Sequence, residues 1–126
     1  MGKWAPFPHP GEFDYSPDEV RARWPRLHAG DAEPLPADPA VLQAWTLFHR
    51  GEFQQAAEAG LKAGGDGITA ANKATCIHAT YLEKKEKVRL ELFLEVAQRA
   101  EAQALRDPRN AAAWYLHGYS LGRYSQ

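Results

Sequence analysis

Proline and alanine divide this chain into two unlike parts. Eight of its nine prolines lie at or before Pro39, and the stretch from Ala40 to Asp107 contains none. Of its 22 alanines, 18 lie from Ala37 onward. Proline breaks the interior of a helix, whereas alanine is the best helix former. We therefore expect an irregular arm over residues 1–36 and a helical domain over residues 37–126.

The arm should contain one short helix. Ser16, Pro17 and Glu19 occupy the N-cap, first and third positions of a capping box, and Pro25 should kink or end the helix early. The arm also carries five aromatic residues, which are too many for a disordered tail, so we expect it to pack on the helical domain. These aromatics are Trp4, Phe7, Phe13, Tyr15 and Trp24.

From residue 38 onward, apolar residues recur at helical spacing, and no stretch alternates long enough to build a sheet. The pattern predicts an all-α fold of helix–turn–helix units joined by short loops. On the longest helix, Glu95 and Arg99 should pair on the outer side. The helices are expected over about 38–50, 52–63 and 69–82, from the charged stretch 83–86 to about 106, and from about 110 onward.

Charge and composition argue against several classes of function. The 126 residues suit one domain, and 15 Lys and Arg against 16 Asp and Glu give no reason to expect nucleic acid or an anionic membrane as partner. The single cysteine cannot form an intrachain disulfide. No apolar run approaches the ~20 residues that cross a bilayer, and the N-terminus lacks the apolar core of a secretion signal. We therefore expect a cytoplasmic protein.

Small and aromatic residues recur at positions where the helices of a hairpin would meet. Ala44, Ala56 and Ala63 are spaced for close helix packing, and Gly51 and Phe53 mark the turn between the helices. A second partial match follows Asp107–Pro108, with Trp114 and Gly118. The pattern resembles the tetratricopeptide repeat, a 34-residue helix–turn–helix unit, over about two thirds of the chain. Departures are Ala40, Gly60, Ile68 and His117, and a middle unit (69–108) that is too long.

The resemblance implies an α–α superhelix of about two and a half helix pairs and a non-enzymatic protein–protein interaction module. Such a module would hold a peptide or a partner subunit in a groove. The strings RLHAGDAEPLP, AWTLFHRGEF and LGRYSQ also resemble uncharacterised bacterial helical-repeat proteins, of which this would be an N-terminal portion or a short member. The candidate partner-binding residues are Gln43, His49, Asn72, Lys73, Arg109, Trp114 and Tyr115.

Two further interpretations concern the ends of the chain. The last helix is apolar and aromatic, so we expect it to expose this face and to pack on a second copy of the chain or on a partner. The aromatic arm could instead fill the groove as an intramolecular plug. Trp45, Phe48, Phe53, Phe93, Trp114 and Tyr115 are expected in the core first and at a ligand second.

The alternative class is a small metal- or His/Cys-dependent enzyme using His49, Cys76 or His78. It requires these groups to converge, yet Cys76 and His78 are two residues apart on a helix and point about 200° apart. His9, His28, His49 and His117 are expected to be isolated, and His28 to form a structural hydrogen-bonded pair with the loop at Asp31 and Glu33. We therefore expect no catalytic residue, metal or cofactor.

Overall fold

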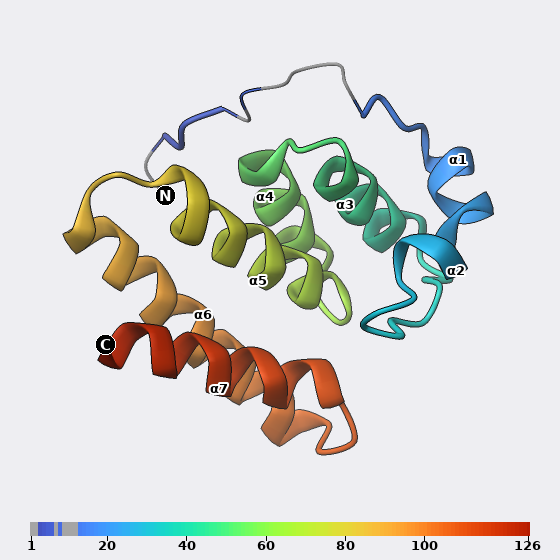
Figure 1. Cartoon of the computed structure of the whole chain (residues 1–126). Coiled ribbons are helices and arrows are strands. Elements are labelled where there is room, and N and C mark those ends of the chain that lie inside the picture. The colour runs from blue at the N-terminus through green and yellow to red at the C-terminus, as the bar shows by residue number, and fades with distance from the viewer. Residues whose placement is uncertain (1–2, 7, 9–12) are drawn as a thin grey trace.

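The computed structural model describes residues 3–6, 8 and 13–126, and all its regular secondary structure is helical. The predicted all-α fold is thereby confirmed. Phe7 of the arm lies outside the described residues. The elements are α1 (Pro17–Ala22), α2 (Trp24–Leu27), α3 (Pro39–His49), α4 (Phe53–Ala63), α5 (Gly67–Ile77), the π-helical turn η1 (His78–Leu82), α6 (Glu86–Arg106) and α7 (Ala111–Ser125) (Figure 1).

Local capping signals place the starts of three helices. Ser16 Oγ accepts a hydrogen bond from the Glu19 amide at 3.2 Å, and the Glu19 carboxylate accepts one from the Ser16 amide, so the predicted capping box is confirmed. Asp38 and Asn110 cap α3 and α7 in the same way, by accepting from backbone amides. The arm helix ends at Ala22, and a second short helix follows it, with Pro25 in its first turn.

Two glycines stand where the backbone geometry requires them, one in a turn and one between two helices. Gly51 has φ of 81° and turns the chain between α3 and α4, a conformation that glycine adopts without strain. Gly60 on α4 lies against Gly67 on α5, and a Cβ at position 60 would come within 2.3 Å of the Gly67 carbonyl oxygen. In the repeat pattern, Gly60 is a departure, because it stands where the repeat has an aromatic residue. In the structure, Gly60 is a residue at which α4 and α5 approach each other closely.

Helix α5 is the centre of the domain. It contacts α3, α4, α6 and α7, while α6 and α7 form a hairpin of their own (Figure 1). One core cluster lies around Phe93, Val96 and Leu116 and includes Trp4 of the arm. A second cluster lies around Trp45 and takes in Val20 and Trp24. Both ends of the arm thus contribute buried side chains to the body.

None of the described helices is both long enough and apolar enough to cross a membrane.

Candidate interaction surfaces

The face of α3 and α5 that should have formed a groove is covered by the arm. Lys73 on α5 forms an ion pair with Asp31, and His49 Nε2 on α3 lies 2.9 Å from His28 Nε2. Both candidate residues are therefore engaged by the chain itself. Trp24 of α2 packs under them, with its indole N–H donating to the Glu33 carbonyl oxygen at 2.7 Å.

Two other candidate residues, Asn72 and Gln43, do not line an open groove. Asn72 is fully buried, and its Oδ1 accepts a hydrogen bond from Arg99 Nε at 2.9 Å, so it cannot line an open groove. Arg99 had been expected on the outer side of α6 beside Glu95, but it reaches inward to α5 and also donates to Thr75. Gln43 is exposed, two residues from the buried Trp45 and therefore on the opposite side of α3.

The predicted pairing of His28 with Asp31 is confirmed, with Nδ1 3.0 Å from Oδ1. The expectation that the histidines are isolated is wrong for His28 and His49, whose Nε2 atoms share a hydrogen bond. Because one ring must donate to the other, at least one of these nitrogens is an unprotonated acceptor. The pair joins residues 21 positions apart, and no local sequence signal marks it.

Burial disfavours the charged form of both histidines. It lowers the pKa of His28, against the opposing effect of Asp31, and it lowers the pKa of His49 to about 4 with help from the His28 charge. Burial, together with the nearby Asp66 carboxylate and against the opposing Lys73 ammonium, raises the pKa of Glu33 to about 7. Burial alone would raise the pKa of Asp31, but the Lys73 ammonium holds it below its usual value.

The groups required by the enzyme alternative are engaged separately. His49 bonds to His28, Cys76 Sγ lies 3.4 Å from Ser120 Oγ on α7, and His78 Nε2 lies 3.0 Å from Glu83 Oε2. Burial raises the pKa of the Cys76 thiol, which disfavours a reactive thiolate. Over residues 3–6, 8 and 13–126, no group of three or more His, Cys, Asp or Glu side chains is placed to hold a metal ion.

The outer face of α7 is exposed and apolar. Trp114 is 44% exposed and Leu121 43% exposed, and between and beside them lie Gly118 and Gly122, where an added Cβ would meet nothing within 4 Å. Tyr115 is also exposed, so Trp114 and Tyr115 do not lie in the core as first expected. We call Trp114, Gly118, Leu121 and Gly122 the α7 face.

The remaining candidates lie at the start of this helix. The Trp114 indole N–H donates to the Pro108 carbonyl oxygen at 2.9 Å, which fixes the ring over the turn between α6 and α7. Arg109 is an exposed residue of that turn. Arg109, Trp114 and Tyr115 thus form the part of the predicted set that is both clustered and accessible.

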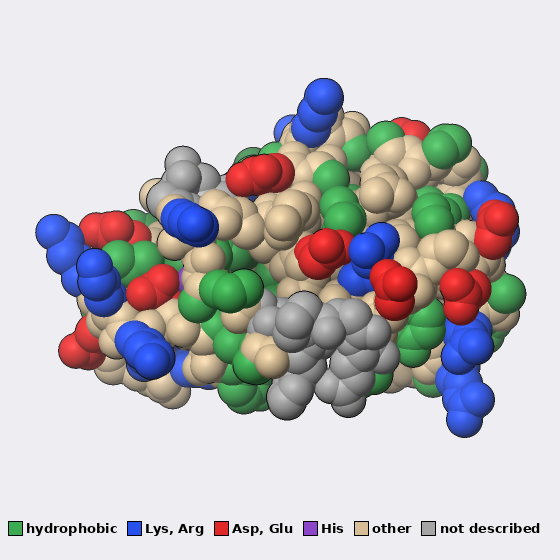
Figure 2. All heavy atoms as spheres, turned by 90° about the horizontal axis from the view of Figure 1, so that it is seen from above, with side chains coloured by type: hydrophobic (Ala, Val, Ile, Leu, Met, Phe, Trp, Pro, Cys, Tyr) green, Lys and Arg blue, Asp and Glu red, His purple; other side chains and the backbone are tan. Residues whose placement is uncertain are grey.

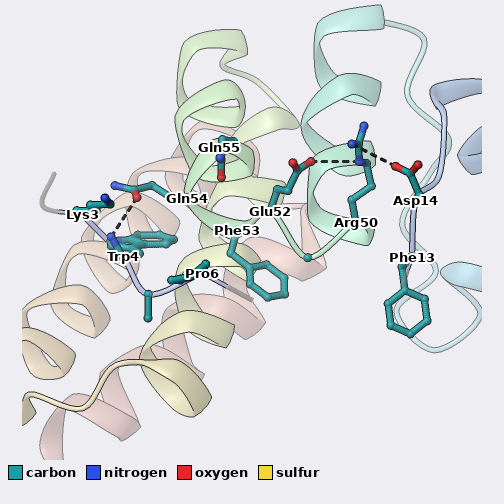
Figure 3. Close-up of a pocket in the computed structure, with 12 residues that line it drawn as sticks. Lys3, Trp4, Pro6, Phe13, Asp14, Arg50, Glu52, Phe53, Gln54 and Gln55 are labelled. Carbon is teal, nitrogen blue, oxygen red and sulfur yellow. Dashed lines mark hydrogen bonds and ion pairs between the residues drawn. The ribbon is translucent and has the colours of Figure 1, made fainter. Parts of the chain in front are cut away.

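The other notable surface is the place where Trp4 of the arm packs between α4, η1 and α6. Its ring stacks on His78 with centroids 4.4 Å apart and planes 9° apart. Its backbone N–H donates to Gln54 Oε1 at 3.0 Å (Figure 3). We call the site formed by His78, Gln54 and the neighbouring Leu92 the Trp4 slot. The sequence predicted that Trp4 would pack on the body but gave no indication of where.

Comparison of the chain with protein-family models, curated proteins and solved structures gives no match.

Proposed function

We propose that this chain is a non-enzymatic, tetratricopeptide-like protein–protein interaction module that acts in the cytoplasm. Its α7 face is the surface that receives an apolar helix of a partner protein. The observation that carries the proposal is the pair of open glycines, Gly118 and Gly122, flanked by the exposed Trp114 and Leu121.

The glycines support the proposal because no contact among the described residues requires them. Glycine within a helix costs about 1 kcal/mol relative to alanine. At Gly60 that cost is offset by the close approach of α4 and α5, whereas a Cβ at Gly118 or Gly122 would enter open space. Four-residue spacing puts both glycines on one side of α7. A partner helix can approach the backbone closely there, between the larger apolar side chains.

The exposed apolar side chains support the same surface. Of the nine large hydrophobic residues exposed in the described part of the chain, five lie on α6 and α7. Clusters of exposed apolar residues mark interaction sites more often than singly scattered ones. We therefore propose that the partner binds the hairpin of α6 and α7, and not the face of α3 and α5 that the arm covers. These five are Leu105, Trp114, Tyr115, Leu121 and Tyr124.

Site-specific photo-cross-linking tests the proposal. A benzophenone amino acid replaces Tyr115 beside the α7 face, and a matched control protein carries it at Tyr81, which is 78% exposed on η1. We expect a protein cross-link from position 115 in cells of the source organism, and its loss in the Leu121→Lys variant. A cross-link to a second copy would identify self-association, which sedimentation from 1 to 100 μM checks directly. Equal cross-linking from both positions, or none from position 115, would refute the proposal.

A further inference from the structure

We propose that the Trp4 slot recognises a tryptophan-bearing extended segment of a partner protein, and that the arm occupies it as an internal competitor. The slot involves α4, η1 and α6 and shares no residue with the α7 face. This second binding site goes beyond the function proposed above and does not depend on it.

The arm enters the slot as a linear ligand would. Trp4 is only 7% exposed, whereas its neighbours Lys3, Ala5 and Pro6 are exposed. A single buried aromatic between exposed neighbours is a usual way for a short peptide to anchor on a surface. The Gln54 amide oxygen accepts a hydrogen bond from the backbone N–H of Trp4. A tryptophan in any peptide carries the same backbone N–H.

Open space continues on both sides of the anchor. A cavity of about 570 Å³ extends from Trp4 past the turn between α3 and α4, where Arg50 and Glu52 line it (Figure 3). A cavity of about 590 Å³ extends the other way along α6, past Lys84 and Glu91. Among the described residues, Lys3, Trp4 and Ala5 line both cavities. A peptide anchored by its tryptophan therefore has room for several residues before and after it.

The charge around the slot favours no strongly charged peptide. Figure 2 looks onto the side of the molecule that the arm crosses, and acidic, basic and hydrophobic side chains are interspersed over it. Each cavity is lined by both signs of charge, with Arg50 near Glu52 in one and Lys84 and Glu91 in the other. The aromatic anchor and the backbone hydrogen bond, rather than net charge, should decide what binds.

His78 supplies the surface on which the aromatic anchor stacks. Its ring is fully buried, and Glu83 fixes its orientation through Nε2. The stacked ring, oriented by Glu83, is therefore a fixed platform for an indole, whether the indole belongs to the arm or to a partner.

The arm competes effectively with a partner because it is part of the same chain. Residues 5–16 connect Trp4 to α1, and those of them that the structure describes form no helix or strand. A ligand joined to its site by a short stretch of chain is present at about millimolar effective concentration, which hides the slot from weak partners. Removing the Trp4 side chain should open it.

The test uses the full-length protein and a fluorescent peptide of its first eight residues, MGKWAPFP. We expect saturable binding to the Trp4→Ala variant, at least tenfold weaker binding to wild type, and none when the peptide carries alanine for tryptophan. The Leu35→Ala variant, which changes an exposed arm residue outside the slot, should behave as wild type. The His78 ring resonances should shift in Trp4→Ala and return when the peptide binds.

Random peptides selected on Trp4→Ala should be enriched in tryptophan, which tests recognition beyond the arm's own sequence. If Trp4→Ala does not fold, a protease site placed at residues 9–12 of the otherwise wild-type chain replaces it. After cleavage, the released segment should exchange with labelled MGKWAPFP. Failure of a folded Trp4→Ala protein to bind the peptide, selection without tryptophan, or a cleaved segment that cannot exchange would overturn the proposal. None of these outcomes bears on cross-linking from position 115.

Discussion

Replacing Glu33 with glutamine should make the stability of this protein depend on pH between 5 and 7. Glu33 and His49 have pKa values shifted in opposite directions, to about 7 and about 4. The folded pKa of Glu33 lies above its unfolded value, so its contribution to stability is present below pH 4.5 and lost as the pH rises through 7. The folded pKa of His49 lies below 6.5, so its contribution is present above pH 6.5 and lost as the pH falls toward 4.

The two contributions nearly cancel in the wild-type protein. Each shift is about 2.5 pKa units from the ordinary values of 4.5 and 6.5, and between pH 7 and pH 5 each changes the free energy of unfolding by up to about 2 kcal/mol. Both side chains are partly exposed, so screening by water reduces this to about 1 kcal/mol. The pKa of His28 is also lowered, so His28, like His49, reduces the free energy of unfolding as the pH falls.

Urea unfolding followed by tryptophan fluorescence at pH 5, 6 and 7 measures the effect. Wild type should vary little with pH. Glu33→Gln should lose about 1 kcal/mol from pH 7 to pH 5, because only the histidine contribution remains. The matched variant His49→Gln should gain stability over the same interval, because Glu33 then dominates. A Glu33→Gln protein as insensitive to pH as wild type would refute this account of the cluster.

Three shorter predictions concern packing. Gly118→Ala should raise the free energy of unfolding by about 0.5–1 kcal/mol, since its Cβ meets nothing, whereas Gly60→Ala should lower it by about 1–3 kcal/mol because its Cβ meets the Gly67 carbonyl; urea unfolding distinguishes the two signs. Phe93→Ala should cost about 3–5 kcal/mol in the same assay, since the ring is 1% exposed. The Cys76 thiol should react with a disulfide reagent only at the rate of unfolding, and rapid reaction of the folded protein would contradict its burial beside Ser120.

Helix starts and ends could be predicted from sequence because their causes are local. Ser16, Asp38 and Asn110 cap the helices that they precede, and each acts on an amide two or three residues away. Gly51 turns the chain where a glycine is needed for positive φ. Such signals involve residues that are close in the sequence, so they can be recognised without knowing the tertiary structure.

The orientation of side chains between helices could not be predicted in the same way. Arg99 was expected to face solvent, but α5 offers it Asn72 and Thr75, and this depends on how α5 and α6 are rotated. The pairing of His28 with His49 requires the arm to fold back onto α3. Of the predicted interaction surface, Arg109, Trp114 and Tyr115 are exposed, because none of the described helices covers the outer side of α7.

The two ends of the arm should differ in what they contribute to folding. Val20 is fully buried, Trp24 is 4% exposed, and both pack on the fully buried Trp45. Deleting residues 1–36 removes both and exposes Trp45, at a cost of roughly 5 kcal/mol or more, comparable with the whole stability of a small domain. We expect this deletion to abolish cooperative urea unfolding, and deletion of residues 1–12, which removes only the Trp4 anchor from the described contacts, to preserve it. A cooperatively folded protein lacking 1–36 would show instead that the arm is a detachable plug and that the α3–α5 face is the groove.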